Sequence, residues 1–540
     1  MMSNKLSFFF LLLLGILVGT TACTDVAVNP KSQASAEDVF SEDGAYKSYL
    51  GKLYGGLVVT GQQGPAGNGD ISAIDDEGFS QYVRLWWQMQ ELPTDEAVIA
   101  WNDGAVQELN TMTWSPSNGF TSGMYSRIFF QVSHVNEFLR QSSDARLDAR
   151  NVDAEVREKM PQWRAEARFL RALSYWHGID LFGNIPVVTE DFPRGGTPPE
   201  QNTRQEVFNF VESELRAITD GEGEENLPPI GEAEYGRADR GAALMVLAKL
   251  YQNAPVYIGE NRSGEVVELT SRIIDAGAYS LEEDYHDLFL ADNHTSDEII
   301  FPVPQDGNRT QHFGGTTYLT CAAIGGSMEP ANYGVNCNWA GLRTTQAAVD
   351  RFEANDTRPV FENTPTGQTQ FFTDGQSLEI SSLTEFTNGY AVPKYQNVTS
   401  TGERGKDIQF PDTDYPMFRL ADAYLMYAEA VLRGGEGSTE RAVSLVNDLR
   451  ERAFGDESGT ITASELTLDF ILEERGRELF WEGSRRTDLI RFGQFTTDEF
   501  LWPWKGDARE GRATSENLRL YPLPASELLA NPNLDQNPGY

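Results

Sequence analysis

The feature that most constrains the fold is a helical period of apolar residues that recurs along most of the chain. In the clearest example, residues 163–181, four side chains recur at steps of three and four and so share one face: Phe169, Leu173, Trp176 and Ile179. Gly183 follows and ends the segment. The same kind of pattern predicts seven further helices, at 39–59, 120–139, 205–218, 240–253, 418–430, 440–453 and 465–481. The sequence therefore predicts an all-α scaffold.

The last three helical segments are joined by short loops and carry Ala at positions where a neighbouring helix can approach closely. This arrangement is typical of stacked helical hairpins, although no strict 34-residue repeat is present. Ser464 is the expected N-cap of the segment 465–481. The final residues, 518–540, contain too many prolines for a helix, and we expect them to lie over the surface as an extended strap.

A long segment, residues 285–413, interrupts the helical pattern and is rich in Gly, Asn, Thr and aromatic residues. Ordered segments of this length without regular structure are uncommon in compact domains and usually carry function. It includes the stretches Gln311–Tyr318 and Asn332–Gly341. We therefore expect a helical scaffold with a loop-rich insertion that carries function; the family resemblance described below implies that the insertion binds the ligand.

The N-terminus has the pattern of an export signal. Lys5 precedes an apolar segment that is too short to span a bilayer comfortably, and small residues lead into Cys23. A cysteine directly after the cleavage position is typical of a bacterial lipoprotein signal, so we expect residues 1–22 to be removed and Cys23 to be acylated. The alternative is an ordinary secretory peptide with an incidental cysteine.

The charge balance excludes one large class of ligand. The chain has 81 acidic and 43 basic side chains, a formal net charge of −38. Nucleic acid is excluded as a partner because its phosphates require clustered Lys and Arg. Neutral ligands remain open.

No motif for a cofactor or a metal is evident. The five histidines are scattered, none begins an HExxH motif, and there is neither a phosphate loop nor a GxSxG elbow. Four residues offer oxygen ligands for calcium without the EF-hand spacing, and we expect a solvated acidic loop there: Asp292, Asn293, Asp297 and Glu298. Apart from Cys23, two cysteines remain, Cys321 and Cys337; they form either one disulfide or two buried free thiols.

One stretch, Leu92–Gly104, places a large aromatic residue, Trp101, among turn-favouring residues. It reads as a loop that presents the indole of Trp101. The alternative is that Trp101 and Trp114 both pack in the core.

Several blocks resemble the SusD/RagB family, the outer-membrane glycan-binding lipoproteins of Bacteroidetes. The blocks are Ala165–Gly183, Phe418–Ala430, Glu474–Gly493, Tyr521–Leu528 and 531–540. The resemblance implies one SusD-like domain over residues 23–540, with an N-terminal part to about 284 and a C-terminal part from about 285. It also implies a tetratricopeptide-like α/α superhelical scaffold, exposure at the cell surface, and a SusC-like TonB-dependent transporter as partner.

Within this family the chain is particularly similar to the starch-binding type, in Leu92–Glu96, residues 306–319, the Trp339 loop and residues 502–506. The similarity implies that starch or maltooligosaccharides, which are α-glucans, bind to an arc of aromatic rings with polar groups at its edge.

The similarity implies that the arc consists of Trp101, Phe313 and Trp339, and that Arg84 and Asn102 form the polar edge. Two departures from the family pattern matter. Phe313 replaces a tyrosine, so one hydroxyl is lost. The chain is also one residue shorter after Trp101, so Asp103 is an alternative to Asn102.

Aromatic platforms suit the apolar faces of sugar rings, and hydrogen-bonding groups suit their hydroxyls. Two other functions are possible. A RagB-like protein with the same fold would bind peptides, and a glycoside hydrolase would need two carboxylates around the bond, for which Asp95 and Glu96 are candidates. Because adjacent carboxylates on a loop rarely face opposite sides of a substrate, we expect a binding protein without catalysis. We expect Trp176, Tyr424 and Trp481 to be core residues. We expect Arg477, Arg485 and Arg486 to form structural ion pairs or to face solvent.

Overall fold

The computed structural model describes residues 36–42, 44–61, 64–65, 69–74, 78–220, 223–359 and 371–540. The expected signal peptide, residues 1–22, and the expected lipidation site, Cys23, lie outside these ranges. Among the described residues, no helix combines the length and the apolar character needed to cross a membrane.

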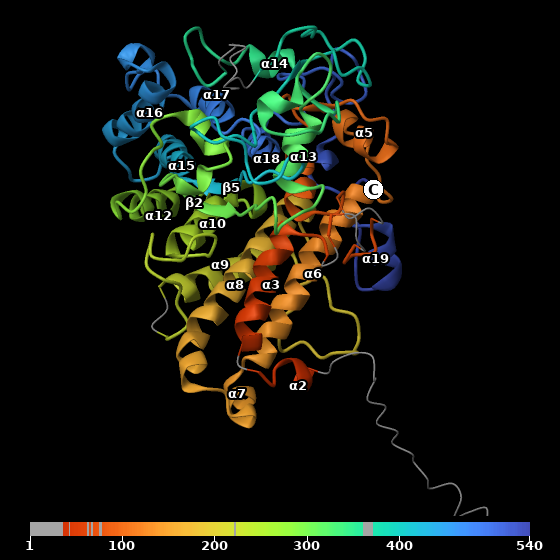
Figure 1. Ribbon diagram of the computed structural model, residues 1–540, viewed down its shortest axis with the longest axis vertical. Helices are drawn as coiled ribbons and strands as arrows, with labels where there is room; N and C mark the ends of the chain where they lie inside the picture. The colour runs from red at the N-terminus through yellow and green to blue at the C-terminus, as the bar shows by residue number, and fades with distance from the viewer. Residues whose placement is uncertain are drawn as a thin grey trace, which may run out of the picture.

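Helices dominate the structure (Figure 1). The longer ones are α3 (Gly44–Val58), α4 (Tyr82–Glu91), α6 (Gly119–Gln141), α8 (Ala154–Phe182), α9 (Arg204–Thr219), α10 (Arg240–Gln252), α12 (Ser263–Asp275), α15 (Leu420–Leu432), α16 (Thr439–Phe454) and α17 (Leu468–Glu478). The shorter ones are α2 (Ala36–Val39), α5 (Gly104–Thr111), α7 (Asp144–Arg150), α11 (Ala254–Tyr257), α13 (Gly315–Ala322), α14 (Gln346–Val349), α18 (Arg485–Arg491) and α19 (Ala525–Ala530). Single 3-10 turns are η1 (Tyr285–Phe289), η2 (Asn293–Thr295), η3 (Pro330–Tyr333), η4 (Glu457–Gly459) and η5 (Glu516–Arg519).

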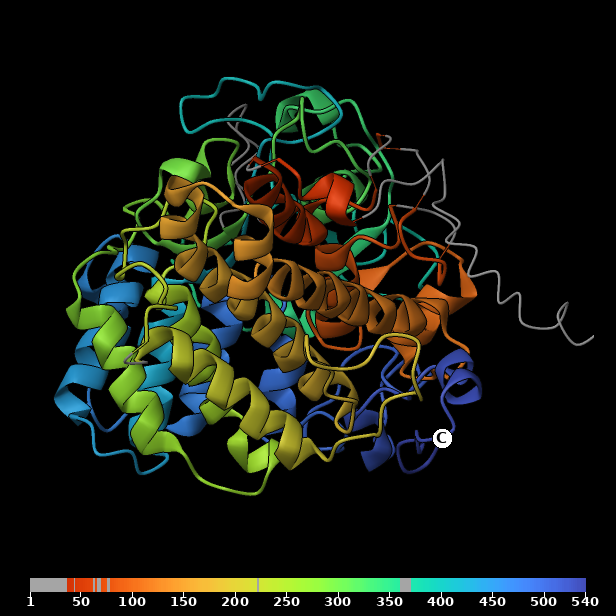
Figure 2. The ribbon, with the colours of Figure 1, turned by 90° about the horizontal axis from the view of Figure 1, so that it is seen from below.

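The long helices stack in the order of the chain. Helix α6 packs on α8, α8 on α9, α9 on α10, α10 on α12, α12 on α15, and α15 on α16. Figure 2 shows this succession from below, with the colours changing in sequence order from orange to blue. The expectation of an all-α, tetratricopeptide-like scaffold is therefore confirmed. Helix α12 was not predicted from the sequence, although it fills the gap between α10 and α15.

Two small antiparallel sheets accompany the helices. One pairs β2 (Ile299–Val303) with β5 (Tyr415–Arg419), and the other has the order β1 (Val98–Ile99), β3 (Leu342–Thr344), β4 (Tyr390–Ala391). Every residue of β5 is buried, so its sequence shows no alternation between apolar and polar residues. This explains why the helix predicted to begin at 418 begins two residues later, at the start of α15.

Two further predicted helix boundaries were wrong, and so was the expectation that the strap at 518–540 contains no helix. The first long helix begins at Gly44 rather than 39, after the short α2. The N-cap of α17 is Thr467, whose side chain accepts a hydrogen bond from the backbone N–H of Phe470 (3.2 Å), and Ser464 lies outside the helix. In the C-terminal strap, α19 forms because Pro524 precedes its first turn, where a proline removes no helical hydrogen bond.

Hydrogen bonds join helix α4 and the residues after it to Trp481, which lies almost 400 positions later in the sequence. The Trp87 indole N–H donates to the carbonyl of Trp481 (2.9 Å), and the Trp481 indole N–H donates to the carbonyl of Glu96 (2.9 Å). Trp481 is fully buried and Trp176 is 5% exposed, so the prediction of core positions is confirmed for both. Tyr424 is half-buried and packs against the core.

Charged side chains are buried in the C-terminal half as a connected group, which we call the buried ion cluster: Glu298, Asp356, Arg358, Arg419, Arg450, Arg452, Glu474 and Glu478. Arg358 bonds Glu474 (2.8 Å) and Glu478 (3.0 Å). Burial alone would raise the pKa of Glu478, but Arg452, Arg419 and Arg358 outweigh it and lower this pKa to about 2. The three guanidinium groups therefore keep Glu478 ionised inside the protein.

Candidate functional site

Three aromatic side chains from distant parts of the sequence meet on one side of the insertion, as the sequence analysis anticipated. The ring centroids of Trp101 and Trp339 are 6.3 Å apart, and those of Phe313 and Trp339 are 6.1 Å apart. The ring planes are inclined by 51° and 62°, so the three rings are not coplanar. All three residues are partly exposed. We call this set the aromatic arc.

Trp101 is held by the loop that carries Trp339. Its indole N–H donates to the carbonyl of Trp339 (2.9 Å), and the backbone N–H of Ala100 donates to the carbonyl of Gly341 (2.8 Å). A Cβ at Gly341 would lie 2.8 Å from the indole, so this position must be glycine. Trp114 is different: it is 4% exposed and packs in the core, which makes the core interpretation correct for Trp114 alone.

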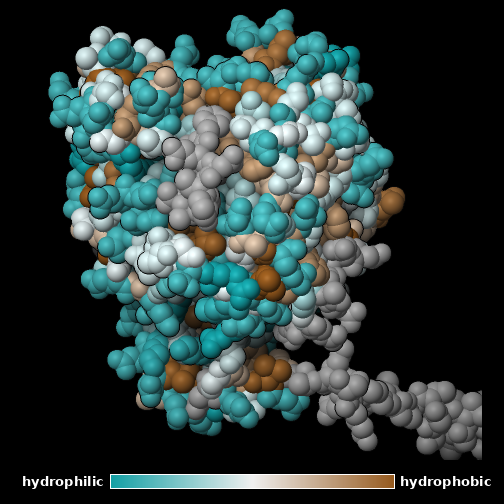
Figure 3. Space-filling model, turned by 45° about the horizontal axis from the view of Figure 1, so that its top comes forward, coloured by the Kyte–Doolittle hydropathy of each residue, from teal (hydrophilic) through white to brown (hydrophobic). Residues whose placement is uncertain are grey.

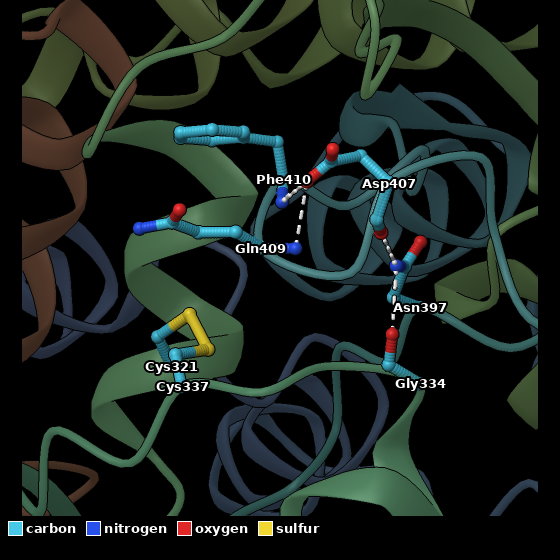
Figure 4. The surroundings of a disulfide bond; sticks show 7 residues. All are labelled: Cys321, Gly334, Cys337, Asn397, Asp407, Gln409 and Phe410. Carbon is cyan, nitrogen blue, oxygen red and sulfur yellow. Dashed lines mark hydrogen bonds between the residues drawn. A yellow bond between two sulfur atoms is a disulfide. The ribbon is translucent and has the colours of Figure 1, made fainter.

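A disulfide fastens the Trp339 loop to α13, which follows Phe313. Cys321 and Cys337 are bonded, with their Cα atoms 5.3 Å apart (Figure 4). The backbone N–H of Trp339 also donates to the carbonyl of Cys321 (3.0 Å). The disulfide closes the loop 321–337, which Phe313 and Trp339 flank in the sequence, and the free-thiol alternative is wrong.

Arg84 lies behind the rings rather than at their rim. Its guanidinium carbon is 4.0 Å from the centroid of Phe79 and 4.3 Å from that of Tyr318, and only 3% of the residue is exposed. Its Nη1 donates to the carbonyl of Phe313 (3.1 Å). Arg84 thus fixes the backbone that carries Phe313.

The residues after Trp101 are both exposed. Asn102 follows the indole directly, and Asp103 is the N-cap of α5 without a side-chain capping bond. Either side chain can meet a ligand at the rim, but with different chemistry. An amide donates and accepts hydrogen bonds, whereas a carboxylate only accepts them.

The carboxylates considered for hydrolysis are in the interior. Asp95 and Glu96 are 0% and 1% exposed, and they pair with Arg485 (2.8 Å) and Arg351 (2.9 Å) respectively. Neither can reach a substrate at the arc without breaking a buried ion pair. The prediction that Arg485 is structural is confirmed by the same contact.

Arg477 and Arg486, expected to form structural ion pairs or face solvent, are buried partners of Glu474 (2.8 Å) and Asp180 (3.1 Å). The expected acidic loop at 292–298 is only partly solvated, because Glu298 is fully buried between Arg419 and Arg452. The described residues contain no group of three or more His, Cys, Asp or Glu side chains arranged to hold a metal ion.

His312, next to Phe313, is buried and neutral. Its Nδ1 accepts from the backbone N–H of Gly314 (3.0 Å), so its Nε2 carries the proton and donates to Gln305 Oε1 (3.0 Å). Burial lowers the pKa of His312 from 6.5 to about 3. A charged imidazole would lose the Gly314 contact.

This pKa predicts a pH-dependent stability. Below about pH 6.5 the unfolded chain binds a proton at His312 that the folded protein does not, so stability falls as the pH falls toward 3, by ~1.4 kcal/mol per pH unit. Between pH 7 and 5, urea unfolding should show about 2 kcal/mol more loss for the wild type than for His312→Gln. If the free energy of unfolding fell equally with pH for the wild type and His312→Gln, the low pKa of His312 would be contradicted.

Comparison with known proteins places this geometry in a family. A family model described as the SusD family matches residues 362–540. Over 97% of this chain and 96% of the relative, the sequence is 33% identical to the starch-binding protein SusD of Bacteroides thetaiotaomicron. The chain belongs to the SusD family.

Solved structures with SusD-like folds superpose on the whole scaffold. A SusD superfamily protein from Parabacteroides distasonis gives a TM-score of 0.70 at 20% identity, covering 92% of this chain and 99% of that chain. Surface glycan-binding protein A from Bacteroides thetaiotaomicron, solved in complex with laminarihexaose, gives 0.68 at 20% identity with the same coverage. At this identity the similarity establishes the fold.

Three further rings, which sequence reasoning did not assign, support the aromatic arc. Phe79 and Tyr318 contact Trp101 at centroid distances of 6.4 and 5.9 Å, and Phe410 contacts Phe313 at 5.6 Å. Tyr318 lies in α13, whose residues are all buried, so it gives no periodic signal. Phe410 comes from a loop almost a hundred residues away from Phe313, and nothing local links the two.

Proposed function

We propose that this SusD-family protein captures α-glucan, as starch or maltooligosaccharides, at the cell surface and delivers it to a SusC-like TonB-dependent transporter. In this proposal it is anchored to the outer membrane through lipid on Cys23 and performs no catalysis. The observation that carries the proposal is the meeting of Trp101, Phe313 and Trp339 in one non-coplanar, partly exposed set.

The geometry of the arc suits a curved glycan. A sugar ring has an apolar face that packs on an aromatic platform, and a helical α-glucan presents such faces in successive orientations. Rings inclined by 51° and 62° follow that curvature, whereas a flat chain fits coplanar platforms. Covering ~100 Å² on each ring at ~25 cal/mol/Å² stabilises the complex by several kcal/mol before ordering costs. The expected net affinity is weak.

The polar residues of the proposed site have two roles: some contact the sugar at the rim of the aromatic arc, and one supports a ring of the arc. Asn102, or Asp103 beside it, is exposed and meets the sugar hydroxyls, while Arg84 holds Phe313 in place from behind. The name of the 33% identical relative, a starch-binding protein, supports the choice of ligand. The laminarihexaose complex of a structural neighbour makes β-1,3-glucan the competing ligand.

The absence of catalysis is supported by the position of Asp95 and Glu96. Both carboxylates are buried in ion pairs, so they do not flank a ligand on the arc. A hydrolase would need two carboxyl groups on either side of the glycosidic bond.

Affinity electrophoresis tests the proposal. Gels containing starch, pullulan, dextran, laminarin or levan should retard the wild type with starch and pullulan, which contain α-1,4 linkages, and not with levan. Trp339→Ala should migrate in the starch gel as it does without polysaccharide. Retardation by laminarin alone, or equal retardation of the variant and the wild type by starch, would contradict it.

A further inference from the structure

A turn that begins at Asp407 is fixed from two sides. The Asp407 carboxylate accepts hydrogen bonds from the backbone N–H groups of Gln409 (2.7 Å) and Phe410 (3.0 Å) (Figure 4). The side-chain amide of Asn397 donates to the carbonyls of Asp407 (2.8 Å) and Gly334 (3.0 Å). The turn is therefore tied to the segment that leads into the Trp339 loop.

The turn lies beside the aromatic arc. The ring of Phe410 packs on Phe313, and the backbone N–H of Asn336 donates to the carbonyl of Ile408 (2.8 Å). The side chains of Gln409 and Phe410 leave the turn in the same direction (Figure 4). The Gln409 amide and the Phe410 ring therefore lie on the same side of the turn.

The amide of Gln409 has no partner within the described part of the chain. The residue is partly buried, and its side-chain oxygen and nitrogen take part in no hydrogen bond there. An amide offers two N–H donors and a carbonyl acceptor, and the amide of Gln409 reaches solvent, so it can exchange water for the hydroxyls of a ligand. A rigid turn thus presents free hydrogen-bonding capacity next to the rings.

We propose that Gln409 determines linkage specificity by pairing its amide with two neighbouring ring hydroxyls of the bound glucan, O2 and O3. The inference rests on the proposed function of the arc. A 1,4-linked glucose keeps both hydroxyls free, so one can donate to the amide oxygen while the other accepts from its N–H. In a 1,3-linked chain O3 forms the glycosidic bond and has no hydrogen to donate. Gln409 accordingly favours maltooligosaccharides over laminarioligosaccharides.

Calorimetry on the full-length mature protein tests this role. Gln409→Met keeps the length of the side chain and removes both polar groups. Gln205→Met, on the exposed face of α9, is the control and removes only an exposed hydrogen bond to Asn209 (2.9 Å). With maltoheptaose, Gln409→Met should bind about five- to tenfold more weakly than wild type, because two neutral hydrogen bonds are lost. With laminarihexaose the change should stay below about twofold. The control should match wild type with both ligands.

The outcomes separate this inference from the proposed function. Equal maltoheptaose binding by Gln409→Met and wild type overturns the role of Gln409 and leaves the arc intact. Equal losses for maltoheptaose and laminarihexaose overturn the linkage selection. A wild type that binds neither ligand overturns both proposals. Gln409 loses no hydrogen bond on substitution, so a lowered melting temperature that accompanies weaker binding would show a structural role and overturn the inference.

Discussion

Replacing Trp101 with alanine should weaken maltoheptaose binding by about 50-fold or more. The ring supplies ~100 Å² of platform, worth ~2.5 kcal/mol, and each 1.4 kcal/mol is tenfold in affinity. The substitution also removes the indole N–H that donates to the carbonyl of Trp339 (2.9 Å), so a second ring loses a constraint. Isothermal titration calorimetry at high protein concentration measures the change.

Trp101→Phe separates the two effects. It keeps an aromatic platform and removes the donor to Trp339, so its affinity should lie between those of the wild type and Trp101→Ala. Because Trp101 is partly exposed, the melting temperature of Trp101→Phe should change little relative to the wild type. Retention of wild-type affinity by Trp101→Ala would remove this residue from the site.

Replacing Arg358 with methionine should lower the free energy of unfolding by about 3–5 kcal/mol. The guanidinium is fully buried and bonds the carboxylates of Asp356 (2.7 Å), Glu474 (2.8 Å) and Glu478 (3.0 Å). Its removal leaves buried negative charge with fewer partners, which costs more than the lost contacts themselves. The urea unfolding midpoint should fall.

An exposed ion pair provides the matched control. Arg441 bonds Asp275 (2.7 Å) with both side chains partly exposed to solvent, so Arg441→Met should cost less than about 1 kcal/mol. Adding Asp356→Asn to Arg358→Met removes one uncompensated charge and should recover part of the loss, because Asp356 forms no other ion pair within the described residues. If Arg358→Met and Arg441→Met lowered the free energy of unfolding equally, burial would not determine how much the cluster contributes to stability.

The sequence predicted the helical scaffold well because its helices have one apolar face. Helices such as α6, α9 and α16 bury one face, and their predicted ranges overlap the observed ones. Two short elements that are buried on all sides were missed. Helix α13 and strand β5 are entirely buried, so no alternation between buried and exposed residues marks them.

The site could be predicted only in part. The family resemblance selected Trp101, Phe313 and Trp339, which the structure brings together. The same reasoning placed Arg84 at the rim, but the side chain lies behind the rings, because its neighbours Phe79 and Tyr318 enclose it. Such enclosure depends on tertiary packing between segments more than two hundred residues apart, which no local pattern records.

The hydrogen bonds that join α4 and the residues after it to Trp481 have a consequence for how the chain acquires its structure. A hydrogen bond joins Trp87 and Trp481 across 394 positions, and the indole N–H of Trp481 also donates to the carbonyl of Glu96. Residues near 90 leave the ribosome long before their partners exist, so the emerging N-terminal half has to remain incompletely assembled until almost the whole polypeptide is available. A fragment covering only residues 362–540 would likewise expose the surfaces that α4 normally covers, and expression trials should use the intact mature chain.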